Sequence, residues 1–180
     1  MSNILNNINL DKIQETLQKG QKDDQFLKKP VKLEGEWNFD VQKGYQFKTE
    51  LAYENGKQII EIDSPSFLGG SGNRLGPMGY CVAGITSCFI TTFMTILSKQ
   101  GIRLGKMRIN AECNINFAKT FDISEEPITE GINFEIDADS IDNTTTLDRQ
   151  QLRHLITMAE ERFPAIYSMS HIIKVNAKLK

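Results

Sequence analysis

The sequence is poor in the residues that metal sites and disulfide frameworks require. Three of its 180 residues are cysteines and two are histidines, His154 and His171. It contains no Cys-x-x-Cys pattern and no His-Glu-x-x-His pattern. Three scattered cysteines are too few for a stabilising set of disulfides, and this composition does not predict a zinc site. We therefore expect reduced thiols in a cytoplasmic protein, with no metal and no cofactor.

Strong charge and targeting signals are absent as well. The formal net charge is −2, and acidic and basic residues are mixed along the chain. This balance predicts neither a nucleic-acid partner nor a membrane partner. The N-terminus has no basic start followed by an apolar segment, so we expect no signal peptide.

The glycine-rich segment 64–76 lacks the signature of a phosphate-binding loop. A Walker loop needs Lys followed by Ser or Thr after its last glycine, whereas Pro77 and Met78 stand there in this chain. We interpret the segment as a loop whose glycines permit close backbone contact. Arg74 is its only cation.

What the sequence does contain is a long uncharged stretch, residues 77–98. Pro77 suits the first position of a helix, and Gly101 suits the position just past its end. Apolar residues occur all round this helix, which predicts burial on most sides. The stretch is long enough to span a membrane, but interspersed glycine, serine and threonine make it only moderately apolar. We expect the buried central helix of a soluble domain.

Alternating apolar and polar residues predict antiparallel strands on both sides of this helix. The predicted strands are 31–39, 45–53, 57–63, 107–117, 128–138 and 171–179. We expect Asn55 and Gly56 to form a two-residue hairpin turn with positive φ. A second helix is predicted at about 147–162, capped by Thr145 or Thr146 and closed by Pro164. The order βββ-α-ββ-α-β indicates an α+β fold.

Residues 1–30 have a different character from the domain predicted for residues 31–180. Asn9 can cap a short helix from Leu10 to Lys19, with Gly20 after its end. The polar segment that follows, to Pro30, is typical of a linker. We expect an N-terminal helical extension and linker without a chemical role.

The thiols are the candidate reactive groups. Cys81 and Cys88 lie seven residues apart on the predicted helix, with their Cα atoms ~10.5 Å apart. A disulfide needs Cα atoms within about 7 Å, so these two cannot bridge while the helix is intact. Cys113 alternates with polar residues and is interpreted as a small core residue. From spacing alone, Cys88 is either a reactive thiol or inert packing, and His171 is a possible neighbour of a thiol.

The segment 63–102 resembles the signature of the OsmC/Ohr family, the osmotically inducible and organic hydroperoxide resistance proteins. In that family a strand ends in an Asp-x-Pro turn and a Gly-Gly loop, and a proline then opens a long helix with a cysteine in its core. The matching residues here are Asp63, Pro65, Gly69-Gly70, Pro77 and Ser87-Cys88. The order of elements over residues 31–180 matches too. The resemblance implies an intertwined homodimer, with antiparallel sheets wrapped around long central helices.

The resemblance also implies a chemistry and shows departures from it. Active members are thiol peroxidases that reduce organic hydroperoxides, and Cys88 matches their attacking cysteine. Their second, resolving cysteine corresponds to Phe163, and Met78 and Gly79 stand where they have a glutamate. Their arginine near the thiolate comes from a loop that has no arginine here, so Arg74, Arg162 or His171 would supply the charge. We take Arg74 as the candidate.

Two functional hypotheses follow. The first is a peroxidase that uses Cys88 alone, or with Cys81 or Cys113 as an unusual resolver, and an external thiol reductant. The second is a dimer of the same fold that has lost this chemistry and binds a small apolar molecule at its interface. A cation near Cys88 favours the first hypothesis, and an apolar closed environment favours the second.

Overall fold

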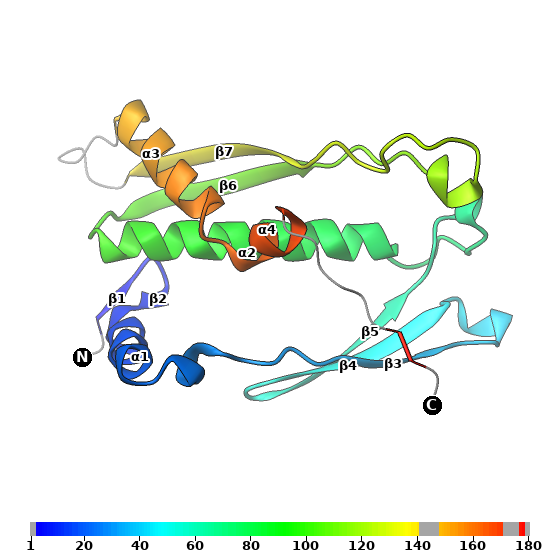
Figure 1. The fold of residues 1–180 in the computed structure, drawn as a ribbon, viewed down its shortest axis with the longest axis horizontal. Coiled ribbons are helices and arrows are strands. Elements are labelled where there is room, and N and C mark those ends of the chain that lie inside the picture. Colours follow the sequence, from blue (N-terminus) through cyan, green and yellow to red (C-terminus); the bar gives the residue numbers. More distant parts are fainter. Residues whose placement is uncertain (1–2, 141–147, 171–176, 179–180) are drawn as a thin grey trace. The chain divides into compact units, whose positions relative to one another are not determined.

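The structure is a computed structural model that describes residues 3–140, 148–170 and 177–178. It combines a long helix and shorter helices with antiparallel strands, so the predicted α+β class is confirmed (Figure 1). By contacts the chain divides into two units, described separately here. The core unit is Met1–Glu15 with Gly84–Lys180, and the sheet unit is Thr16–Ala83.

The sheet unit contains a three-stranded antiparallel meander in the predicted order. Its strands are β3 (Glu34–Trp37), β4 (Phe47–Tyr53) and β5 (Gly56–Ile62). One face of β4 is more buried than the other, as its alternation predicts: Thr49 is buried, and its hydroxyl donates to the Glu34 carbonyl oxygen at 2.6 Å. Strand β3 is shorter than predicted. Short 3-10 turns at Asp24–Leu27, Val41–Lys43 and Ser66–Leu68 connect the elements.

The hairpin turn between β4 and β5 lies one residue earlier than predicted. Tyr53 pairs with Gly56, so Glu54 and Asn55 form the turn, and neither Asn55 nor Gly56 has a positive φ. Packing of the Tyr53 side chain explains why Gly56 lies in the strand and not in the turn. A Cβ on Gly56 would lie 2.7 Å from the Tyr53 hydroxyl oxygen, so the ring occupies the space above a glycine that belongs to the strand.

The core unit packs α2 (Pro77–Lys99), from Gly84 onwards, against a two-stranded antiparallel sheet and a second helix. The sheet consists of β6 (Leu104–Glu112) and β7 (Asn133–Ser140), with the 3-10 turn Lys119–Phe121 between them, and the helix is α3 (Arg149–Glu160). Inward and outward residues alternate along β6 as predicted. The core residues are Phe89, Phe93, Leu97, Ile102, Leu155, Ala159 and Phe163.

The bounds of α2 agree with the prediction, but its burial does not. The helix begins at Pro77, and Gly101 follows its end with φ +75°. Within the single chain only Phe89, Phe93, Leu97 and Ser98 of this helix are buried. Phe89, Phe93 and Leu97 form one stripe at helical spacing on the face that packs into the core cluster, whereas Ser98 is buried against the N-terminal residues Leu5 and Asn6. The prediction of burial on most sides is therefore wrong for one chain alone.

By length and composition, α2 is also able to cross a membrane, as its best window has a mean hydropathy of 1.7. A core helix of a soluble protein passes the same test.

The C-terminal part differs from the prediction at two helix ends. The N-cap of α3 is Asp148, whose side chain accepts a hydrogen bond from the Gln150 amide at 2.9 Å. The predicted cap at Thr145 or Thr146 is therefore wrong, because a carboxylate stands closer to the first turn; both threonines lie outside the described residues. Pro164 does close α3, and it also opens a short helix, α4 (Pro164–Ser170). The predicted strand 171–179 lies almost wholly outside the described residues.

The N-terminal segment holds an additional hairpin that the sequence did not indicate, β1 (Ile4–Leu5) with β2 (Ile8–Asn9). Asn9 caps the following helix as predicted, accepting from the Lys12 amide at 3.1 Å. That helix, α1 (Leu10–Lys22), continues past Gly20, so Gly20 does not end it. A Cβ on Gly20 would lie 2.6 Å from a Leu27 methyl carbon, so packing against Leu27 explains the glycine.

Candidate thiol site on the central helix

The candidate reactive thiol, Cys88, lies in the middle of α2. It is half-buried and packs against the core cluster that contains Phe89. Its carbonyl oxygen accepts a hydrogen bond from the Thr92 hydroxyl at 3.0 Å. In the part of the chain that the structure describes, no hydrogen bond or ion pair reaches its sulfur atom. Cys88 lies three turns from the N-terminus of α2, beyond the reach of the helix dipole, so activation requires a cation from elsewhere.

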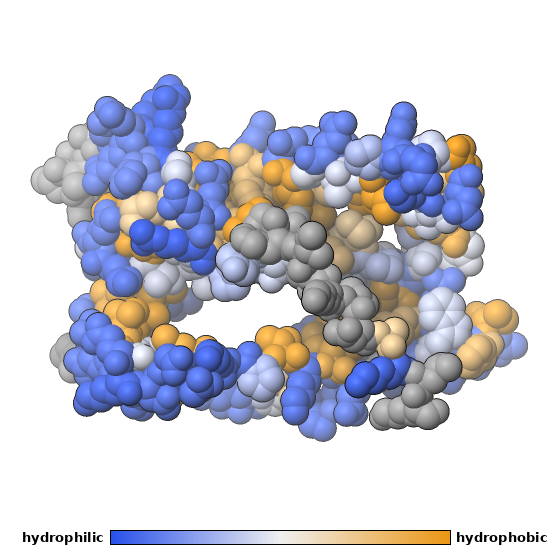
Figure 2. Space-filling model, viewed as in Figure 1, coloured by the Kyte–Doolittle hydropathy of each residue, from blue (hydrophilic) through white to orange (hydrophobic). Residues whose placement is uncertain are grey.

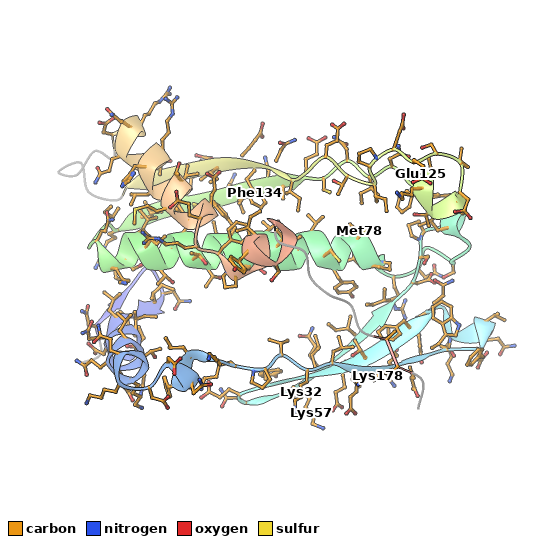
Figure 3. The ribbon with its side chains drawn as sticks, viewed as in Figure 1. Lys32, Lys57, Met78, Glu125, Phe134 and Lys178 are labelled. Carbon is orange, nitrogen blue, oxygen red and sulfur yellow. The ribbon has the colours of Figure 1, made fainter. Side chains whose placement is uncertain are left out.

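An aromatic cluster lies directly beside this position. The Phe89 ring stacks on Phe134 with centroids 4.9 Å apart, and Phe163 meets it edge-on at 5.6 Å. Figure 3 shows Phe134 on β7 beside α2. Phe163, where the resemblance places a second cysteine, is 2% exposed. The fold thus brings the turn between α3 and α4 against the residue that follows Cys88.

The other two thiols are free and are not part of this cluster. Cys81 is exposed on α2, about two helical turns before Cys88. Cys113 is half-buried just after β6, with its sulfur 3.3 Å from the Thr129 hydroxyl oxygen. Since α2 is continuous from Cys81 to Cys88, a disulfide between these two remains excluded by helix geometry.

A buried carboxylate organises the glycine-rich loop that leads into α2. Asp63 is 2% exposed, and its Oδ2 accepts from the Ser71 hydroxyl at 2.6 Å and from the Ser71 and Asn73 amides at 2.9 and 3.4 Å. The bond from the Ser71 hydroxyl is the main cause that holds the pKa of Asp63 below its usual value of 3.8. Gln46 supports the same loop, since its side chain accepts from the Ser64 amide at 3.0 Å.

The close backbone contact expected of the loop glycines is confirmed at Gly70. A Cβ there would lie 1.9 Å from the Ser64 carbonyl oxygen, which no side chain tolerates. Gly69 and Gly72 have φ values of +82° and +71°, where residues other than glycine are strained.

Arg74 forms an ion pair in this loop. Its Nε and Nη2 atoms each lie 3.2 Å from Oε2 of Glu61 on β5, and its Nη1 donates to the Asn73 carbonyl oxygen at 3.1 Å. Sequence reasoning selected Arg74 but missed Glu61, because the pair spans 13 residues of irregular chain and leaves no periodic signal. Of the other candidate cations, Arg162 is exposed after α3, and His171 lies outside the described residues.

Among the residues described, no group of three or more His, Cys, Asp or Glu side chains could hold a metal ion. What the site does offer is a thiol beside an apolar, aromatic cluster.

Comparison with known proteins finds one matching family. A model of the OsmC-like protein family matches residues 70–178, more than half of the chain and the part that contains Cys88 and Phe163. No curated protein matches the sequence.

Solved structures share the fold at low identity. An OsmC-like protein of unknown function from Vibrio cholerae has a TM-score of 0.59 and 16% identity, covering 78% of this chain and 94% of its own. An OsmC-like protein from Mycoplasma pneumoniae has a TM-score of 0.55 and 14% identity, covering 81% and 91%. The organic hydroperoxide resistance protein OsmC from Legionella pneumophila has a TM-score of 0.54 and 18% identity, covering 79% and 91%. Within this fold α2 is the core helix, and the chain belongs to the family of OsmC-like proteins.

Proposed function

We propose that this protein is a cytoplasmic thiol peroxidase that reduces organic hydroperoxides through Cys88. The observation that carries the proposal is that Cys88 is only half-buried in the middle of the core helix, so the apolar cluster beside it does not close the thiol off from a hydroperoxide. The Legionella relative, named an organic hydroperoxide resistance protein, supports the substrate class. An apolar surround suits the organic part of such a substrate.

The reaction begins with attack of the Cys88 thiolate on the outer oxygen of the hydroperoxide. A sulfur–oxygen bond forms, the oxygen–oxygen bond breaks, and the alcohol leaves after taking up a proton. Cysteine is oxidised by two electrons to sulfenic acid while the hydroperoxide is reduced to the alcohol. An external thiol then condenses with the sulfenic acid, releasing water, and a second thiol releases reduced Cys88 from the mixed disulfide.

A single-cysteine cycle follows from the residues around the thiol. By the family resemblance Phe163 stands at the position of the resolving cysteine, and Cys81 is held too far away along α2. Cys113 contacts the Thr129 hydroxyl and lies among half-buried strand residues. We therefore assign the second half of the cycle to an external thiol.

We further propose Arg74 as the cation that stabilises the Cys88 thiolate. Its contacts to Glu61 and to the Asn73 carbonyl oxygen orient the guanidinium, and since a guanidinium has five N–H donors, further donors remain for a thiolate. The predicted consequence is that Arg74→Ala slows the reaction of Cys88 with hydroperoxide without changing its reaction with excess alkylating agent in denaturant.

A second candidate function rests on one observation. A hollow of about 370 Å³ opens next to Phe89 and is lined mainly by Ile132, Phe134, Ile136 and Ile156, with Asn133 and Glu160. Its size lies at the lower end of the range for small-molecule sites, roughly 300–1,000 Å³. An OsmC-like protein without peroxidase chemistry would use a hollow of this kind, or its subunit interface, to bind a small apolar molecule.

A peroxide-consumption assay separates the two functions. We expect the wild-type protein to consume cumene hydroperoxide in the presence of dithiothreitol, and Cys88→Ser to lose at least about 100-fold in rate, since the nucleophile is removed. Cys81→Ser and Cys113→Ser are matched controls and should retain the wild-type rate. Equal rates for wild type and Cys88→Ser would reject the peroxidase and favour the ligand-binding function.

A further inference from the structure

The N-terminal hairpin β1–β2 places two asparagines in an unusual backbone conformation. Asn6 and Asn7 have φ values of +50° and +63°, which are the left-handed conformations of a tight two-residue hairpin turn. Asparagine tolerates this region better than other residues with a side chain. The hairpin belongs to the core unit and lies at the C-terminal end of α2 (Figure 1).

The Asn6 side chain makes three hydrogen bonds to the corner between α2 and β6. Its Nδ2 donates to the Ser98 hydroxyl at 3.0 Å and to the Ile102 carbonyl oxygen at 2.8 Å, and its Oδ1 accepts from the Leu104 amide at 3.0 Å. A carbonyl can only accept and an amide N–H can only donate, so these partners fix the orientation of the carboxamide. Every bond reaches more than ninety residues along the chain.

Ser98 connects the same hairpin to the interior of the core. It is fully buried, and its hydroxyl donates to the Leu5 carbonyl oxygen at 3.1 Å while accepting from Asn6. Both bonds of this buried hydroxyl therefore lead to the hairpin. Withdrawal of the hairpin would break these partly buried hydrogen bonds to Ser98, Ile102 and Leu104, which is unfavourable.

We infer that residues 3–9 form a conformational lock that holds the end of the core helix and the start of β6 in place. The partners Ser98, Ile102 and Leu104 lie inside the segment that the family model matches, whereas Asn6 lies outside it. The lock makes the order of the α2–β6 corner depend on the docking of the N-terminal segment, so opening the hairpin is a route to loosening the helix that carries Cys88.

Hydrogen–deuterium exchange of the full chain tests this inference, with Asn6→Gly compared with Asn7→Gly. Both substitutions suit the left-handed backbone, but only Asn6 contributes side-chain hydrogen bonds to the corner. For Asn6→Gly we expect exchange in peptides covering residues 98–104 to rise about tenfold or more, and Tm to fall by about 4–8 °C. Asn7→Gly, at an exposed position, should leave both unchanged.

Ser98→Ala provides a second variant that keeps a strong helix-forming residue at this position. It should raise exchange in the same peptides, and the double variant with Asn6→Gly should be less than additive, because the two residues share a bond. Unchanged exchange at 98–104 in Asn6→Gly, or equal effects of Asn6→Gly and Asn7→Gly, would overturn the lock. Peroxidase activity does not enter this test, so its outcome is independent of the proposed function.

Discussion

At the scale of single residues, the conformation of the loop before α2 depends on Asp63 and Gly70. Asp63 accepts three hydrogen bonds from residues of the loop, and Gly70 lies where a Cβ would collide with the Ser64 carbonyl oxygen. Both residues hold backbone in place, and neither touches the candidate thiol. Their role is to shape the entry into the core helix.

Because the pKa of Asp63 is shifted in the folded state, its contribution to stability depends on pH. Because hydrogen bonding lowers the pKa in the folded state, the unfolded chain binds a proton at higher pH than the folded chain. The stabilisation is therefore complete well above pH 3.8 and is lost as the pH falls through the lower, folded-state pKa. We expect Asp63→Asn to lower Tm at pH 7 by about 4 °C or more, and to flatten the loss of stability on acidification.

Thermal unfolding of wild type and Asp63→Asn between pH 7 and pH 3 checks this. Glu54→Gln, at an exposed turn position, is the matched control and should behave as wild type. A variant curve that runs parallel to the wild-type curve at every pH would show that Asp63 makes no pH-dependent contribution.

At the scale of elements, Phe163 in the turn between α3 and α4 tests whether the family pattern was assigned correctly. Since the Phe163 ring meets the Phe89 ring, a thiol placed there by Phe163→Cys should reach Cys88 if the Cα atoms lie within about 7 Å. We expect oxidation to join Cys88 and position 163, while loss of the buried ring costs about 3 kcal/mol of stability.

Mass spectrometry of peptides from the oxidised variant is the measurement. The Cys88→Ser, Phe163→Cys double variant is the control for non-specific pairing. If the oxidised single variant yields no peptide that joins Cys88 to position 163, the assignment of Phe163 to the resolving position is incorrect.

Elements that a hydrophobic pattern and helix-end residues define could be predicted. Those defined by side-chain contacts, or too short to show a pattern, could not. Pro77 and Gly101 bracket an uncharged run, so the bounds of α2 could be predicted from the sequence. The turn at Asn55 was misplaced because the Tyr53 ring, and not the turn, selects Gly56. The short β1–β2 hairpin carries too few residues for a periodic signal.

The same division applies to the candidate site. Cys88 and Phe163 were identified by resemblance, and the structure places Phe163 against Phe89, the residue after Cys88. The pairing of Arg74 with Glu61 was missed, since two charged side chains far apart in the sequence give no pattern that indicates their contact.

At the scale of the whole molecule, we propose a homodimer. Much apolar side-chain surface is left exposed by the single chain, as Figure 2 shows for one face. Val31, Phe39 and Val41 are at least 90% exposed, and α2 is covered on one stripe only. Large exposed apolar side chains gathered in this number mark an interaction site. A second copy is the occupant that the family resemblance implies.

Light scattering after size-exclusion chromatography should return twice the single-chain mass of 20.4 kDa at micromolar concentration. Phe39→Asp should shift the population towards the single chain, because it places a charge on a surface that the dimer buries. Lys32→Asp offers a charged control at a position of the same segment that is already polar. A wild-type mass near 20.4 kDa would contradict the dimer.

The central claim, a one-cysteine peroxidase, is tested most directly by the intact mass of the protein after brief exposure to cumene hydroperoxide without reductant. With no resolving thiol beside it, sulfenic acid at Cys88 persists or is oxidised further to sulfinic acid. The account predicts one or two added oxygen atoms that map to Cys88, with Cys81 and Cys113 unmodified. A loss of two hydrogen atoms that maps to a disulfide between Cys88 and another cysteine of the chain, or no change at Cys88 at all, would contradict it.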